Sequence, residues 1–143
     1  MAKTIATILG AAFILVGLLG FVAPGMMGMH LTLTHNLVHL ISGALALYFG
    51  LAGTLSGART FCIVFGAVYA LLGVAGYLLG TDQAHTVNVA GHGATDNSLL
   101  KVLPGNLELA APEHGLHILL GLVFLVGGLL TKGDVRAAVR DAT

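Results

Sequence analysis

Two short stretches of the sequence place histidines where a long apolar run begins. The chain reads HNLVHL from His35 and EHGLHI from Glu113. His35 and His39 are four residues apart, and Glu113 and His117 have the same spacing, so each pair shares one helix face. Neutral imidazole forms hydrogen bonds, carries protons and is a good ligand for zinc, copper or haem iron. Ionisable groups at such positions indicate a functional site.

Three interpretations of these residues remain open. In the first, His39 and His117 hydrogen-bond across helices, at about 0.6 kcal/mol per bond. In the second, the two facing histidines clamp one haem, or a metal ion such as copper is bound by a larger set: His35, His39, Glu113, His114 and His117. In the third, the cluster transfers protons or acts as a catalytic base.

No sequence motif decides among these interpretations. The chain contains no H-E-x-x-H zinc-protease motif, and it lacks the repeated carboxylates of di-iron helix bundles. The stretch MMGMH, from Met26 to His30, adds thioethers that suit Cu(I), but it also reads as an ordinary apolar loop, which we favour. Because no nucleophile and no mid-membrane charge stand out, we interpret the chain as non-enzymatic.

The composition indicates a membrane protein. Hydrophobic residues make up 57% of the 143 residues and charged residues only 8%, whereas soluble domains are about 25% charged. The 21 glycines lie mostly inside the apolar runs. The formal net charge is zero, so no basic surface indicates a nucleic-acid partner.

Apolar runs of near-spanning length predict four transmembrane helices, because about 20 apolar residues cross the hydrocarbon core as a helix. The predicted helices occupy about residues 5–23, 34–55, 60–80 and 112–131 of a single domain, 1–143. The long outer loop between the last two, 81–111, contains turn signals and an amphipathic stretch, 99–109. We expect that stretch to lie on the membrane surface and cover the histidines.

The distribution of basic residues predicts the orientation. With four crossings, one side holds Lys3, Arg59, Lys132, Arg136 and Arg140, whereas the other holds only Lys101. The positive-inside rule therefore predicts cytoplasmic termini in a bacterial inner (plasma) membrane. All seven histidines then fall on the outer half. The single Cys62 excludes an intrachain disulfide there.

The helices also contain an internal repeat. The stretch FILVGLLGF (13–21) matches YALLGVAGY (69–77), and His39 aligns with His117. Glycines recur at intervals of seven residues, which is nearly two helical turns, so they form stripes along helix faces. Small residues on a stripe let helix backbones approach closely in lipid. The sequence therefore predicts two similar helical hairpins packed into a four-helix bundle.

Three stretches carry a family resemblance: HNLVHLISGALAL, FGAVYALLGVAGYLLG and HGLHILLGLVFLVGG. Together they resemble a widespread bacterial family of small four-helix membrane proteins catalogued as a domain of unknown function. The resemblance covers about residues 5–131, and its N-L-V-H-L signature is carried by Asn36 to Leu40. Family members often read N-D-x-x-L-H on the last helix, where this chain has P-E-H-G-L-H and Glu113 supplies the acidic group. The resemblance implies the fold and no activity.

The sequence thus predicts an all-α membrane protein with an outer-side His/Glu site. We interpret it as a non-enzymatic accessory subunit whose partners are the lipid bilayer and other membrane subunits or further copies of itself. The alternatives are a haem- or copper-binding membrane protein that uses His39 and His117, and a proton-coupled carrier or enzyme.

Overall fold

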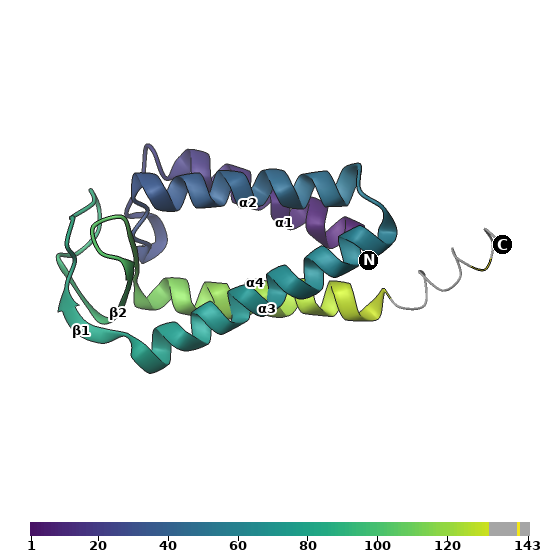
Figure 1. Cartoon of the computed structure of the whole chain (residues 1–143). Coiled ribbons are helices and arrows are strands. Elements are labelled where there is room, and N and C mark those ends of the chain that lie inside the picture. The colour runs from purple at the N-terminus through teal and green to yellow at the C-terminus, as the bar shows by residue number, and fades with distance from the viewer. Residues whose placement is uncertain (132–139, 141–143) are drawn as a thin grey trace.

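The computed structural model describes residues 1–131 and residue 140, and within them the chain is mostly helical (Figure 1). Residues 1–131 contain four α-helices, as predicted. They are α1 (Ala2–Leu19), α2 (Leu33–Leu51), α3 (Leu55–Leu79) and α4 (Ala111–Leu130), with a short 3-10 turn, η1 (Met26–Gly28), before α2.

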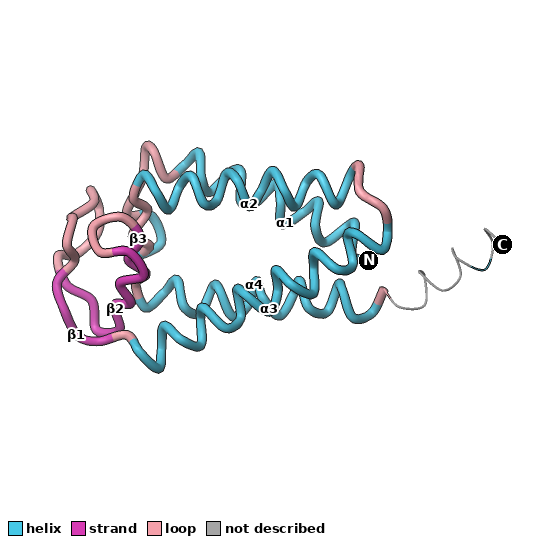
Figure 2. Tube along the Cα trace, in the orientation of Figure 1, coloured by secondary structure: helices cyan, strands magenta, loops and turns pink. Residues whose placement is uncertain are grey.

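The prediction of a purely helical chain was wrong in the segment between α3 and α4. That segment contains an antiparallel sheet of three strands in the order β1-β2-β3: β1 (Thr81–Ala84), β2 (Thr95–Leu103) and β3 (Leu107–Leu109). Gly105 has a φ of +76° and allows the tight turn between β2 and β3. We call residues 80–110 the outer cap; Figure 2 shows it across one end of the helices. The strands are short and half-exposed, so they lack the regular alternation by which strands are recognised.

The helices form two antiparallel pairs, α1 with α2 and α3 with α4, and glycines make the closest contacts within each pair. A Cβ added at Gly43 of α2 would lie 2.8 Å from the carbonyl oxygen of Gly10 in α1. In the second pair, a Cβ added at Gly66 of α3 would lie 2.7 Å from the carbonyl oxygen of Gly121 in α4. The backbones are therefore so close that only glycine fits at these crossing points.

The contacts nearer the cap also recur in both pairs. In the first pair, Gly20, the C-cap residue of α1, makes room for the side chain of Asn36 in α2. At the equivalent place in the second pair, Gly76 of α3 makes room for the ring of His114 in α4. The offsets match the internal repeat, which places 20 with 76 and 36 with 114. The four helices are thus arranged as two equivalent pairs.

The two pairs pack on each other through aromatic side chains. Phe13 of α1 lies 6.1 Å from Phe124 of α4 and 5.3 Å from Tyr69 of α3, measured between ring centroids. Phe65 of α3 adds an edge-on contact with Phe124 at 5.4 Å. At the end opposite the cap, the backbone N–H of Ala2 donates to the hydroxyl of Thr131 at 3.0 Å. Large aromatic side chains therefore make the central contacts between the pairs, and Gly127 of α4 packs against Ile5 of α1.

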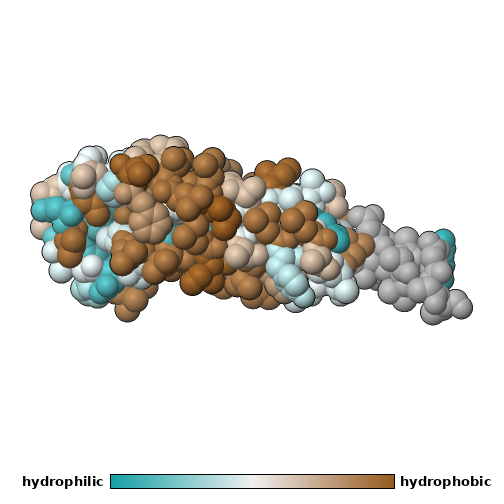
Figure 3. Space-filling model, turned by 90° about the horizontal axis from the view of Figure 1, so that it is seen from above, coloured by the Kyte–Doolittle hydropathy of each residue, from teal (hydrophilic) through white to brown (hydrophobic). Residues whose placement is uncertain are grey.

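Three of the four helices, α1, α3 and α4, are long and apolar enough to cross a membrane. Apolar side chains gather over the helices in Figure 3, and polar residues gather at the cap end. The prediction that α2 is itself apolar enough was wrong. Its first half carries four polar residues that are all buried: His35, Asn36, His39 and Ser42. These residues lower the hydropathy of α2 without exposing polar groups on its outer surface.

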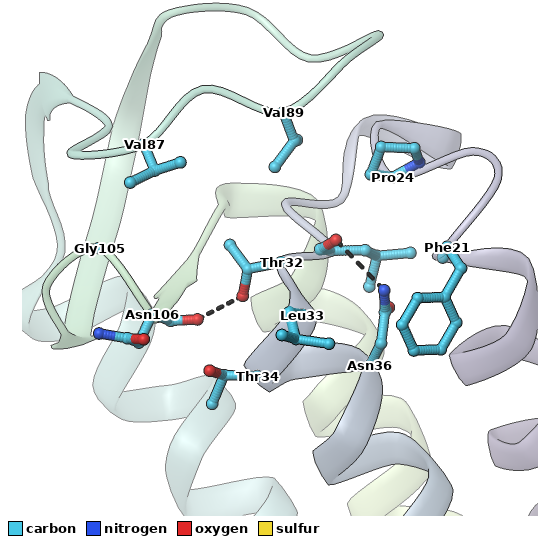
Figure 4. Close-up of a pocket in the computed structure, with 12 residues that line it drawn as sticks. Phe21, Pro24, Thr32, Leu33, Thr34, Asn36, Val87, Val89, Gly105 and Asn106 are labelled. Carbon is cyan, nitrogen blue, oxygen red and sulfur yellow. Dashed lines mark hydrogen bonds between the residues drawn. The ribbon is translucent and has the colours of Figure 1, made fainter.

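The start of α2 is tied to the cap (Figure 4). Thr32 is the N-cap of α2, and its hydroxyl accepts a hydrogen bond from the backbone N–H of His35 at 3.3 Å. The same hydroxyl donates to the carbonyl oxygen of Asn106. A groove of about 370 Å³ lies here, but Thr32 and the amide NH₂ of Asn36 are already bonded to protein carbonyls. These bonds hold the start of α2 against the cap, while Oδ1 of Asn36 has no hydrogen-bond partner in the described part of the chain.

The glycine contacts give a test of the fold. We expect Gly43→Ala to lower the free energy of unfolding by about 1–3 kcal/mol, because the new methyl group collides with the backbone of α1. Gly115→Ala in α4 is the matched control, since its Cβ meets only the Tyr77 hydroxyl, at 3.3 Å. Thermal unfolding in detergent, followed by circular dichroism, measures both variants. Equal stability of the two would contradict the close packing of α1 and α2.

Candidate functional site

Four of the five predicted site residues meet between the two helix pairs, just below the cap. His35 and His39 come from α2, and Glu113 and His117 come from α4. We call these four residues the histidine row. All four are at most 6% exposed. They are brought together because α2 and α4 both begin at the cap and each turns its polar face inward.

His35 lies at the centre of the row. Its Nδ1 is 3.1 Å from Oε1 of Glu113 and 3.2 Å from the carbonyl oxygen of His30. Its ring stacks on the ring of His39 at 4.7 Å with an interplanar angle of 15°, and its centroid is 6.4 Å from that of His117. Both neighbouring oxygens are acceptors, so the proton of His35 belongs on Nδ1.

The other two histidines occupy equivalent places in the two helix pairs. His39 lies 5.5 Å from the ring of Phe13 in α1. His117 lies 5.2 Å from the ring of Tyr69 in α3, in an edge-on arrangement. Phe13 and Tyr69 are themselves equivalent in the repeat. Each imidazole is therefore held in place by an aromatic ring of the helix that it packs against.

The position of Glu113 follows from the start of α4. Its carboxylate oxygen Oε2 accepts a hydrogen bond from the backbone N–H of Ala110, the N-cap residue, and its own N–H donates to the Ala110 carbonyl at 3.0 Å. A carboxylate at a helix N-terminus is also favoured by the helix dipole. One oxygen of Glu113 therefore caps α4, while the other faces His35.

Two cavities flank the histidine row, and both are lined by His35 and His117. The first, of about 160 Å³, opens between α1 and α4 and includes Ala12 and Leu116 in its lining. The second, of about 230 Å³, lies between α2 and α3. Its lining residues correspond to those of the first: Val68 to Ala12, Leu72 to Val16, Val38 to Leu116 and Ser42 to Leu120. The row thus separates two equivalent, largely apolar cavities.

Three buried atoms of the row lack a hydrogen-bond partner in the part of the chain that the structure describes. One is Oε1 of Glu113, which faces His35, and the other two are Nδ1 of His39 and Nδ1 of His117. A buried polar atom without a partner costs about 1–3 kcal/mol. His39 and His117 both line the first cavity, so a polar atom placed there would recover that energy. The arrangement can bind a small molecule by hydrogen bonds or pass a proton along the row.

His114 stands apart from the other predicted residues. Its Nε2 lies 2.6 Å from the carbonyl oxygen of Ser98, which accepts its hydrogen bond, and its ring packs at Gly76. His114 therefore fastens the cap to α4. The predicted metal site of His35, His39, Glu113, His114 and His117 stays a prediction. Within the described residues, the groups with ligand atoms close enough for one ion lie in the cap instead.

The sequence interpretation missed a second cluster, which we call the outer cluster: His30, His85, His92, Asp96 and Glu108. Ligand atoms of His30, His85 and Glu108 lie within 4.8 Å of one another, as do those of His85, His92 and Asp96. The rings of His30 and His85 stack at 4.0 Å. The one available signal was the gathering of all seven histidines on the predicted outer half, which does not reveal which of them meet.

Burial and neighbouring charges alter the acidity of the outer cluster. Burial lowers the pKa of His85, and the nearby His30 and His92 lower it further, although Glu108 opposes this change. Burial by itself would raise the pKa of Glu108. Hydrogen bonds from Thr86 and Gly105, together with Lys101, outweigh it and hold the pKa at about 2. The cluster thus combines a neutral imidazole with a carboxylate that stays ionised.

Comparison with known proteins assigns the chain to a family. The family model described as "Domain of unknown function (DUF4383)" matches residues 3–103, so the chain belongs to that family. The predicted membership of an uncharacterised family is therefore confirmed. No curated protein and no solved structure matches the chain significantly.

The dual role of Glu113 can be tested with two variants. We expect Glu113→Ala to lower the free energy of unfolding by about 1–3 kcal/mol, because the N–H of Ala110 loses its acceptor and His35 loses the carboxylate beside it. Glu113→Gln should cost less, since its amide oxygen still caps α4. Chemical or thermal unfolding in detergent measures the difference. Equal losses for the two variants would show that the cap bond contributes nothing.

Proposed function

We propose that this chain, as a member of a family of unknown function, is a non-enzymatic membrane protein that binds a small lipid-soluble molecule at its histidine row. The protein crosses the bilayer four times as two similar hairpins. The observation that carries the proposal is the pair of unpaired imidazole nitrogens, on His39 and His117, beside an apolar cavity.

The four crossings are inferred from the pairing of the helices. α2 runs antiparallel along α1, from Asn36 beside Gly20 at one end to Gly50 beside Thr7 at the other. If α1 crosses the bilayer, α2 crosses with it. Its polar residues are buried against protein, so lipid meets only its apolar face, which includes Leu37, Ile41 and Leu45.

The orientation follows from charge. Lys3 and Arg59 lie at the end away from the cap, whereas Lys101 lies in the cap. Arg140 belongs to the same side as Lys3 by chain order, and Lys132 and Arg136 lie outside the described residues. The positive-inside rule therefore places the termini in the cytoplasm and the cap outside a plasma membrane.

The cavity indicates the class of ligand. Most of its lining is apolar, and its four polar residues gather on one side: His35, His39, Glu113 and His117. A mostly apolar pocket with a few convergent polar groups is typical of small-molecule sites. Ala12 in its lining is exposed between α1 and α4, at a depth where lipid surrounds the helices. A molecule with an apolar body and one hydrogen-bonding head can therefore enter from the bilayer.

The proposal leaves two sequence interpretations to experiment. Haem or copper held by His39 and His117 would give an optical spectrum or bound metal in the purified protein. An accessory role would agree with the many apolar side chains exposed on the helices, which can contact lipid or partner helices equally well. Neither interpretation changes the expected location of the site.

The proposed topology predicts which positions reagents can reach. Gly93→Cys in the cap should react with a membrane-impermeant maleimide in intact cells, because it lies outside and is exposed. Thr54→Cys, at the turn between α2 and α3, should react only after the membrane is broken. Cys62 is buried and should remain unreactive in both. Labelling of Thr54→Cys in intact cells would contradict the four-crossing topology.

The ligand site can be tested by filling the cavity without changing any histidine. We expect wild-type protein, purified in mild detergent, to carry a small molecule that is detected by native mass spectrometry. Ala12→Phe should release it, because the new ring occupies the cavity mouth. Ala11→Phe is the matched control, since Ala11 is exposed on the same helix and lines no part of that cavity.

Two results would contradict the proposal: a protein that carries no molecule in any preparation, and equal retention by Ala12→Phe and Ala11→Phe. An optical spectrum and elemental analysis of the same samples test the haem and copper alternatives directly. A haem band or bound metal that disappears in His39→Ala and His117→Ala would replace the proposed ligand class.

A further inference from the structure

The outer cluster joins three segments of chain that are far apart in the sequence. His30 follows η1, His85 follows β1, and Glu108 lies in β3. All three side chains are buried: His30 and Glu108 are fully inaccessible, and His85 is 8% exposed. Burying three polar side chains costs free energy unless they have partners, so their meeting here indicates that they share one.

The ring of His30 is prepared as a ligand. Its Nε2 lies 2.6 Å from the carbonyl oxygen of Val87. Because a carbonyl oxygen only accepts, the proton of the neutral ring belongs on Nε2 and Nδ1 keeps its lone pair. That Nδ1 is buried and has no hydrogen-bond partner among the described residues. Metal-binding histidines usually donate their other ring N–H to a backbone carbonyl in this way, which fixes the tautomer.

The other two residues have the spacing that one ion requires. Nδ1 of His85 lies 3.4 Å from Oε2 of Glu108. Two ligand atoms about 2.0–2.1 Å from a tetrahedral Zn²⁺ lie about 3.3 Å apart. Neither ring nitrogen of His85 makes a hydrogen bond to the described part of the chain. Nothing else there satisfies this buried ring.

The carboxylate of Glu108 is oriented by the cap backbone. Its Oε2 accepts from the N–H of Thr86 at 2.9 Å and its Oε1 accepts from the N–H of Gly105 at 2.8 Å. An ionised carboxylate has about four lone-pair positions, two on each oxygen, so Oε2 keeps one position for a metal. Nζ of Lys101 lies 3.9 Å from Oε1, which is not the oxygen beside His85, and it also donates to the Thr86 hydroxyl.

We propose that the outer cap binds one Zn²⁺ ion through His30, His85 and Glu108. Two imidazoles and a carboxylate are a ligand set that zinc uses, with a fourth position left open. The ring of His92 lies 4.8 Å from that of His85, but its two nitrogens face the carbonyl oxygens of Gly93 and Gly28 at 2.9 Å, so we assign the open position to water. The ion fastens β1, β3 and the segment after η1 together on a side of the protein where no disulfide can do so.

The test is a calorimetric titration of the full-length protein in detergent, after treatment with a chelator, with ZnCl₂. We expect one ion to bind per chain. His85→Ala and Glu108→Gln should each weaken binding at least about 100-fold, more than the 10–100-fold effect of a lost outer-shell partner. His39→Ala is the matched control, because it removes an imidazole from the histidine row and should leave zinc affinity unchanged.

Three results would overturn the proposal. The first is the absence of stoichiometric binding, and the second is an equal loss of affinity in His39→Ala. The third is a loss in Asp96→Asn without one in Glu108→Gln, which would assign the ion to the more exposed group around His92. Unfolding curves of the metal-free variants separate lost ligands from lost folding. The visible spectrum of the Co²⁺-loaded protein gives an independent readout of tetrahedral nitrogen and oxygen ligation.

Discussion

The arrangement of this chain depends on how closely the two helices of each pair approach. At Gly10 with Gly43, and at Gly66 with Gly121, backbone meets backbone with no room for a Cβ. Lipid provides no hydrophobic force between helices, so dispersion contacts of this kind must hold each pair. The surface between the pairs holds mainly aromatic side chains at its centre, with small residues such as Gly127 beside Ile5. The histidine row lies on the same surface, nearer the cap.

The repeat explains where the row lies, and its departures from symmetry explain the chemistry of the row. Equivalent positions hold His39 and His117, so two imidazoles lie at equivalent depths beside two equivalent cavities. The position of His35, however, is taken by Glu113 in the second half. A symmetric pair of histidines there would leave two imidazoles facing each other. In this chain a carboxylate oxygen instead lies 3.1 Å from the His35 imidazole, so an acidic and a basic group are buried side by side.

The sequence predicted the helical part of the site because the histidine pairs and the packing glycines both recur at helical spacings. His35 and His39, and Glu113 and His117, share faces at a spacing of four, and glycines at a spacing of seven mark the faces that pack. The sequence did not show that the polar residues of α2 are buried against the other helices, and these residues make α2 less apolar than α1, α3 and α4. The outer cluster could not be predicted, since His30, His85 and Glu108 lie in different segments. Their meeting depends on strand pairing with irregular register, as between Thr81 and Gln83.

His30 connects the two clusters that the structure brings into view. Its ring belongs to the outer cluster, whereas its backbone carbonyl lies 3.2 Å from Nδ1 of His35. The same Nδ1 is 3.1 Å from Oε1 of Glu113, which has no hydrogen-bond partner in the described part of the chain. The hydrogen bond of His35 therefore goes to the backbone of His30, and the carboxylate of Glu113 lies beside it. Through His30, the segment that carries a ligand of the proposed zinc site also orients the His35 ring in the histidine row.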